Sequence, residues 1–163
     1  MGEREPVDYI QRTREQYDSL GYPAYQWIYS DSTPAWSPLT KPLSECKVGL
    51  IASGGIYRKG QIAFHFKDDF SYREIVADTP ADELRATHFA YDLTDARADA
   101  NVVFPLQTLQ DCAEKGLIGS VNERAYTFMG GIYSSRKVRD VLAPALAERM
   151  QNDEVDVVLL VPV

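Results

Sequence analysis

Residues 155–163 read VDVVLLVPV and give the clearest indication of the fold class. Eight of these nine residues are uncharged, and a short apolar run rich in valine predicts a buried strand rather than a helix. In open α/β sheets, ligands bind beside the loops that follow the carboxyl ends of the strands. We therefore expect an α/β protein with a site close to Val163.

Two further strands support this prediction. Residues 47–52 (KVGLIA) form a short apolar run that ends in Ser53, Gly54 and Gly55, and residues 125–129 end in Gly130 and Gly131. A strand followed by a glycine pair is typical of the start of a βα unit. The order of strand, glycine turn, helix and strand predicts a doubly wound, mainly parallel sheet flanked by helices.

The predicted helices follow from capping residues and from apolar spacing. Ser134 or Ser135 caps a helix that reaches about Gln151, and Pro144 predicts either a kink or a fresh helix start within it. The other expected elements are an extended segment at 72–76, a short helix from Thr79, a strand or strand end at 87–91, and a helix from Leu106 closed by Gly116.

Residues 1–45 predict an N-terminal helix and a wrapping arm, and residues 46–163 the α/β domain. Residues 6–20 place apolar side chains on one helical face, with Gly21 as the C-cap, so we expect an amphipathic helix against the main domain. Residues 22–42 are rich in proline and aromatic residues, which predicts an extended arm. Trp27, Tyr29 and Trp36 favour burial, on the chain's own domain or on a partner chain.

Composition excludes several classes of function. The net charge of −7 argues against nucleic acid, no apolar run is long enough to span a membrane, and the N-terminus is too charged for a secretory signal. We therefore expect a cytoplasmic protein. Cys46 and Cys112 are too far apart in sequence for a zinc motif or a disulfide framework, so we interpret each as a small buried or half-buried side chain. His65 and His88 are too few to indicate a metal centre.

The residues alone give an incomplete site. The glycine pairs would let backbone N–H groups approach a carboxylate or a phosphate, although any tight turn favours glycine as well. His88 and Asp92 have a spacing at which a carboxylate could orient an imidazole for acid–base work, or His88 is a structural residue in a polar loop. Asn101 is typical of a cap or a turn. Without a complete catalytic set, the sequence indicates a small-anion pocket.

Several blocks taken together resemble a known family. They are VDYIQRTREQYDSLGYPAYQW, PLTKPLSECKVGLIASGGIY, DDFSYREI, THFAYD, DANVVFPLQTL, GLIGSVNERAYTFMGGI and the closing VDVVLLVPV. In this order they resemble the selenoprotein B family of glycine, sarcosine, betaine and D-proline reductases, most of all its short, single-domain members. The resemblance extends from about Val7 to Val163.

This resemblance implies an oxidoreductase whose nucleophile is a selenocysteine or cysteine in the loop after the strand at 155–161. The selenol or thiol would cleave a C–N bond of a small amino-acid-like substrate, with a disulfide as the acceptor. Implied partners are a pyruvoyl subunit, a small acceptor selenoprotein or a thioredoxin-type donor, and a homo-oligomer stays open. The given sequence stops at Val163, before that nucleophile, so the α/β domain is expected to be incomplete at its C-terminus. Either a UGA codon was read as a stop, which we favour, or the protein truly ends there without redox activity.

The resemblance also assigns site residues. His88 and Asp92 match an H-x-x-x-D pattern, with His88 expected as proton donor to the leaving amine or as partner of the selenolate. The glycine turns would hold the substrate carboxylate. The matching pocket residues are Ser53, Gly54, Gly55, Asn101, Phe128, Met129 and Gly130. The alternative is a non-catalytic α/β module that binds a small carboxylate or a partner protein, for which the aromatic arm is the best evidence.

Overall fold

The computed structural model describes residues 8–163 except 25 and 27, and it forms two units, Met1–Ser37 and Pro38–Val163. The predicted boundary between arm and α/β domain, at residue 45, stays a prediction. In the first unit, helix α1 (Tyr9–Ser19) begins after Asp8, whose side chain accepts the N–H of Gln11. Gly21 has a φ of 70°, as predicted for the residue that ends this helix. The predicted helix start at residue 6 lies outside the described residues.

The arm that follows α1 has no regular secondary structure in its described residues up to Ser37. Tyr29 and Trp36 are 88% and 85% exposed, so the predicted burial of these two rings is not met within the first unit. The described residues of this unit form one helix and an extended arm, and neither covers these two rings. Trp27 lies outside the described residues.

The second unit is built on a mixed, mainly parallel sheet of five strands. Strand β1 (Lys47–Ala52) pairs in parallel with β5 (Ser120–Val121), β6 (Arg124–Phe128) and β7 (Val157–Val161), and β3 (Tyr72–Val76) pairs antiparallel with β6. In the longest register, Leu50 lies opposite Leu159. All five β1 residues after Lys47 are buried, which fits a parallel strand covered on both faces.

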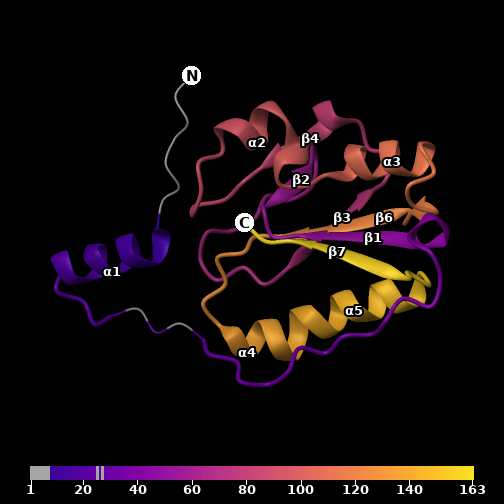
Figure 1. Ribbon diagram of the computed structural model, residues 1–163. Helices are drawn as coiled ribbons and strands as arrows, with labels where there is room; N and C mark the ends of the chain where they lie inside the picture. Colours follow the sequence, from indigo (N-terminus) through magenta and orange to yellow (C-terminus); the bar gives the residue numbers. More distant parts are fainter. Residues whose placement is uncertain (1–7, 25, 27) are drawn as a thin grey trace. The chain divides into compact units, whose positions relative to one another are not determined.

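Helices cover both faces of this sheet (Figure 1). On one face lie α2 (Thr94–Ala98) and α3 (Leu106–Glu114), over a core that includes Leu50 and Phe104. On the other face lie α4 (Ser135–Lys137) and α5 (Ala143–Asn152), over a core that includes Tyr126 and Leu146. The predicted α/β class, a mainly parallel sheet flanked by helices, is confirmed.

The helical segment before β7 restarts at Pro144, as predicted. Ser134 accepts the N–H of Lys137 and caps α4, residues 138–142 form a π-helical stretch, and Pro144 lies in the first turn of α5. Proline has no N–H to donate, so the first turn of a helix is where it costs least.

Two local predictions are wrong. The glycine pair after β1 leads to strand β2 (Ile56–Arg58), which pairs antiparallel with β4 (Leu84–Ala86), and not to a helix. Residues 87–91 contain no strand, because β4 already ends at Ala86. Three short 3₁₀ helices lie within the connecting segments: Leu43–Glu45, Ala81–Glu83 and Ala100–Val102.

Strand β7 also differs from the prediction of a buried, central strand. Among the described residues it pairs with β1 alone, so it lies at an edge of the sheet. Leu159 and Leu160 are 38% and 66% exposed. The apolar run indicated a strand correctly, but composition does not show whether a second strand is present to cover it.

Candidate functional site

The carboxyl ends of β1, β6 and β7 meet at Ser53, the residue that follows β1. The N–H of Ser53 donates to Val161 O at 3.0 Å, and the Ser53 hydroxyl accepts the N–H of Val163 at 2.9 Å. The carbonyl of Ser53 accepts the N–H of Gly130 at 2.9 Å. Ser53 therefore connects all three strand ends and holds Val163 in place.

Close approach between backbone segments explains the glycines at the carboxyl ends of these strands. A Cβ on Gly130 would lie 3.1 Å from the Ser53 Cβ and 3.3 Å from the Val163 carbonyl oxygen. A Cβ on Gly54 would lie 2.9 Å from Val103. The turn is thus packed tightly enough that a side chain at either position would force its neighbours to shift.

Two of the predicted anion-binding N–H groups already have partners. The N–H of Gly55 donates to Phe128 O at 3.0 Å, and the N–H of Gly130 donates to Ser53 O. Met129 is fully buried and forms an antiparallel bridge with Gly54. A carboxylate bound at the carboxyl ends of these strands would therefore need hydrogen-bond donors other than the N–H groups of Gly55 and Gly130.

His88 is buried beside these turns, with 5% of its surface exposed. Its Nδ1 accepts the N–H of Ala90 at 3.0 Å, and its ring packs on Phe89 and on Tyr91, at centroid distances of 5.6 and 4.8 Å. Burial lowers the pKa of His88 below its usual value. The imidazole is therefore neutral near pH 7, and because Nδ1 is an acceptor, the proton is on Nε2.

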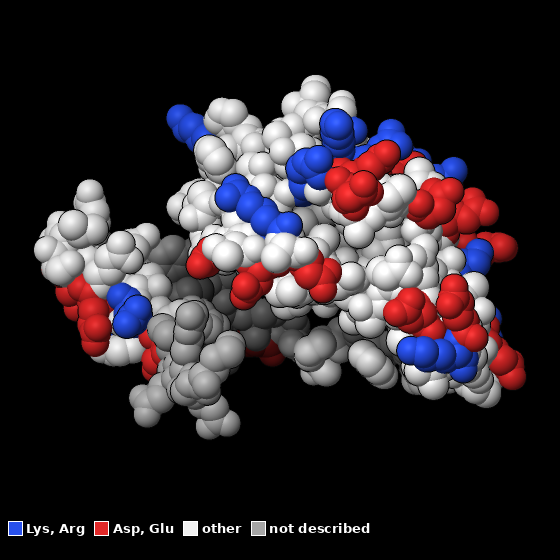
Figure 2. All heavy atoms as spheres, turned by 90° about the horizontal axis from the view of Figure 1, so that it is seen from above, with Lys and Arg blue, Asp and Glu red and all other residues white. Residues whose placement is uncertain are grey.

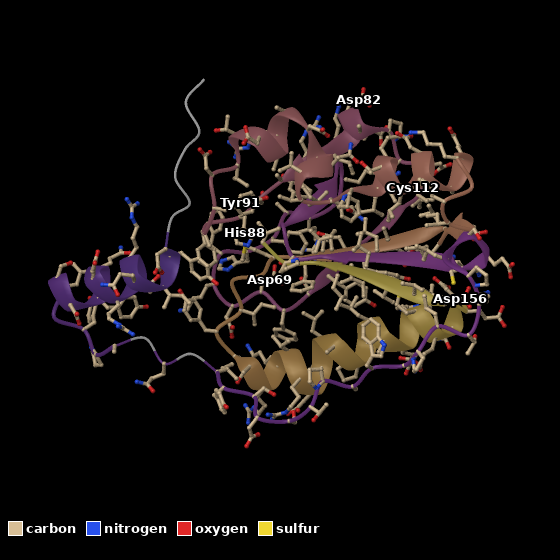
Figure 3. The ribbon with its side chains drawn as sticks, in the orientation of Figure 1. Asp69, Asp82, His88, Tyr91, Cys112 and Asp156 are labelled. Atoms are coloured by element: carbon tan, nitrogen blue, oxygen red, sulfur yellow. The ribbon has the colours of Figure 1, made fainter. Side chains whose placement is uncertain are left out.

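The Nε2–H of His88 has no hydrogen-bond partner among the residues that the structure describes. Buried polar groups are nearly always hydrogen-bonded, so an unpartnered one calls for an explanation. His88 and Tyr91, labelled in Figure 3, lie beside the turn after β1, where Gly54 and Gly55 contact them. His88 thus provides a buried donor close to the strand ends.

Tyr91 fixes the position of this histidine, a role that the sequence did not reveal. The Tyr91 hydroxyl donates to Gly54 O at 2.7 Å, which links the loop that carries His88 to the turn after β1. Burial raises the pKa of Tyr91, so the hydroxyl keeps its proton and remains a donor. Sequence spacing places Tyr91 beside His88 but gives no signal for a bond across 37 residues.

Asp92 and Asn101 are held by other partners. Asp92 Oδ1 accepts the N–H and the hydroxyl of Thr94, the first residue of α2, as in an Asx turn. Asn101 donates to Asp99 and accepts from Thr108 on α3 at 3.3 Å, which ties a 3₁₀ turn to that helix. The structure does not pair Asp92 with His88, and a role in a reaction stays a prediction for both residues.

Cys46 and Cys112 are both free thiols. Cys46 is buried, with its sulfur 3.3 Å from Pro42 O, and Cys112 is half-buried and packs against the α3 core. Both fit the predicted structural interpretation. No group of histidine, cysteine, aspartate or glutamate that could hold a metal ion occurs in the described ranges.

Charge of both signs is mixed on the one face that the space-filling view shows. On the face seen in Figure 2, lysine and arginine side chains alternate with acidic ones over the described residues. Within the part of the chain that the structure covers, no helix has the length and apolarity that crossing a membrane requires.

The fold and the strand-end cluster define an α/β domain whose candidate ligand site lies where its parallel strands end. By its match over residues 25–163, the chain belongs to the glycine/sarcosine/betaine reductase selenoprotein B family. The family that the sequence resembled is thereby confirmed.

Curated relatives agree with this assignment. The chain is 32% identical over 127 residues to D-proline reductase subunit gamma of Acetoanaerobium sticklandii, covering 78% of this chain and 52% of that protein. It is 32% identical over 130 residues to glycine reductase complex component B subunit gamma of Symbiobacterium thermophilum, covering 76% and 30%. The corresponding protein of Carboxydothermus hydrogenoformans is 30% identical, covering 76% and 29%.

The chain thus spans about half the length of the D-proline reductase relative, and less of the glycine reductase relatives. No solved structure matches it significantly.

Proposed function

We propose that this chain forms one part of the active site of a reductase that cleaves a C–N bond in a small amino-acid-like substrate. This part lies at the carboxyl ends of the parallel strands. The observation that carries the proposal is the convergence at Val163. Ser53 holds the Val163 N–H at the point where three parallel strands end, and the unpartnered His88 lies beside Gly55 in the turn after β1. The nucleophile would be a selenocysteine or cysteine on polypeptide that follows Val163.

The proposed chemistry is a two-electron reduction. A selenolate or thiolate attacks the carbon that carries the amine, a bond from selenium or sulfur to carbon forms, and the C–N bond breaks. The amine leaves with the electron pair and takes up a proton. A dithiol donor, as in a thioredoxin-type protein, then breaks the bond from selenium or sulfur to carbon. One donor thiolate bonds to the selenium or sulfur, and the fragment leaves with the electron pair and takes up a proton. The second donor thiol displaces the selenolate or thiolate and closes the donor's disulfide, which completes the two-electron transfer.

Partner proteins fit this scheme. Two relatives are named as subunits of a glycine reductase complex, which supports assembly with other chains. In the scheme, a pyruvoyl subunit activates the substrate amine and a small selenoprotein accepts the product. Both remain part of the proposal for this chain.

The state of His88 favours one of its two expected roles. A neutral imidazole with its proton on Nε2 is a poor acid for a leaving amine, but it is a good hydrogen-bond donor to an anion. We therefore assign His88 as the N–H donor to the selenolate, or to the substrate carboxylate. Tyr91 is a positioning residue, because it acts on the site through Gly54 and His88.

The nucleotide sequence after the Val163 codon tests this proposal. We expect an in-frame TGA followed by an open frame that encodes a further helix and a cysteine, because a recoded TGA would supply the selenol directly after β7. An ordinary stop codon with no coding sequence beyond it would contradict the proposal.

The second candidate function is a non-catalytic module that binds a small carboxylate or a partner protein. The exposed Tyr29 and Trp36 favour it, since exposed aromatic side chains are common at interfaces. The ordinary stop codon described above would favour this alternative over the reductase.

A further inference from the structure

The outer edge of β7 has the features of an interior strand. The described chain pairs it on one side only, along five residues opposite β1. The strand contains no charged residue and no proline, the devices with which exposed edges usually prevent pairing. Leu159 and Leu160 are exposed although they point to opposite faces of the sheet. The backbone groups on the outer side of β7 and the side chains next to them are therefore suited to pairing with another strand.

An apolar groove of about 530 Å³ lies on the α5 face at the same edge. Val158 and Leu160 form its β7 wall, and helix α5 forms the other wall. Residues that line it include Ile51, Phe128, Leu142, Leu146, Val158 and Leu160. Its apolar lining suits apolar side chains of a further helix packed beside α5.

The topology predicts that a helix belongs on this face. Strands β6 and β7 lie on opposite sides of β1, and the segment with α4 and α5 connects them across one face of the sheet. Crossovers between parallel strands are nearly always right-handed. A strand added beyond β7 continues in the same direction, so its crossover helix has to pack on the α5 face, where the groove lies.

We propose that β7 pairs along its outer edge with a parallel strand whose helix fills the groove beside α5, and that this unit is reductase polypeptide equivalent to the unmatched part of the relatives. Nearly half of D-proline reductase subunit gamma lies outside the match, which is ample chain for such a unit. The proposal rests on the family assignment and on the uncovered edge, and not on the redox chemistry proposed above.

The occupant has a definable chemistry. Its strand carries β-branched or leucine side chains at alternate positions, which continue the apolar rows of Val158 with Leu160 and of Leu159. Its helix presents an apolar stripe to the groove and no buried charge. A second copy of this chain is the competing occupant, because an edge strand can also pair with itself across a twofold axis.

The test uses the 163-residue chain and, as probe, the part of the Acetoanaerobium sticklandii subunit outside its 127 matched residues, added as a separate polypeptide. Analytical ultracentrifugation should show a one-to-one complex, and hydrogen exchange at the amides of β7 should slow when the probe is added. Leu160→Lys should weaken the complex at least about tenfold, since it places an unpaired charge in an apolar interface. Ile62→Lys, at an exposed aliphatic residue outside β7 and the groove, should leave binding unchanged.

Failure of the probe to bind would overturn the proposal, as would equal binding by the Leu160→Lys variant. A chain that is already a dimer, with protected β7 amides before the probe is added, would assign the edge to a second copy. If the Leu160→Lys protein does not fold, the hydrogen exchange of the wild-type chain decides alone. None of these outcomes depends on turnover, so they leave the redox proposal to its own test.

Discussion

Replacing His88 with alanine in a reductase that carries this sequence together with its nucleophile should lower turnover by about 100-fold or more. The reason is the loss of the Nε2–H donor, which is buried and lacks a partner among the described residues. In a buried site, one donor to a developing charge is worth far more than in water. The measurement is the rate of product formation at saturating substrate, with the melting temperature as the check that the fold is intact.

The matched control is His88→Gln, which keeps an N–H donor and should recover part of the lost rate. The pH profile separates the two roles of the histidine. A donor that is already neutral gives a rate that does not fall as the pH rises above the lowered pKa of His88, whereas an imidazolium acid would lose activity there. Unchanged turnover in His88→Ala would remove His88 from the site.

Replacing Gly55 with alanine should destabilise the protein by about 3 kcal/mol or more, the largest stability effect expected of any single glycine in the turn. Gly55 has a φ of 69°, and an added Cβ would overlap the carbonyl oxygen of Thr87. That carbonyl belongs to backbone that already bonds to Gly55 through the Thr87 N–H, so it cannot move away without breaking the connection between β1 and the His88 loop. Urea unfolding measures the change.

Gly116→Ala provides the control for backbone conformation. Gly116 also has a φ of 69°, but an added Cβ would meet nothing within 4 Å. This variant should cost only about 1 kcal/mol, the penalty of the left-handed conformation itself. Equal losses in the two variants would show that the close contact at Gly55 contributes nothing.

The fold class could be predicted because short apolar runs, a capping serine and a proline indicate strands and helices locally. The apolar runs at 47–52 and 125–129 became β1 and β6, Ser134 became a helix cap, and Pro144 became a helix start. Strand pairing is not a local property. The glycine turn after β1 therefore gave no sign that it leads to β2, which pairs with a strand nearly 30 residues later along the chain.

The edge position of β7 was missed for a similar reason. An apolar run indicates that a strand favours burial, but it does not indicate which segment or chain pairs with it and covers it. The exposed Leu160 and the groove beside it were therefore visible only after the sheet order was known.

The candidate site, too, was predicted in part. The resemblance grouped Ser53, Met129 and Gly130, and the structure brings them together at one edge. The pairing of His88 with Asp92 assumed that a spacing of four places two side chains together, which holds on a helix. The backbone there is irregular, and it turns the Ala90 N–H onto His88 while Asp92 bonds to Thr94.

The most direct test of the central claim, that the strand-end cluster binds the substrate, is a nuclear magnetic resonance titration of the isotope-labelled 163-residue chain with glycine, sarcosine, betaine and D-proline. The account predicts that at least one of these ligands shifts the signals of Ser53, Gly54, Met129 and the His88 side chain, while Gly116 stays unchanged. Shifts confined to residues away from the ends of β1, β6 and β7, or no shifts with any of the four ligands, would contradict it.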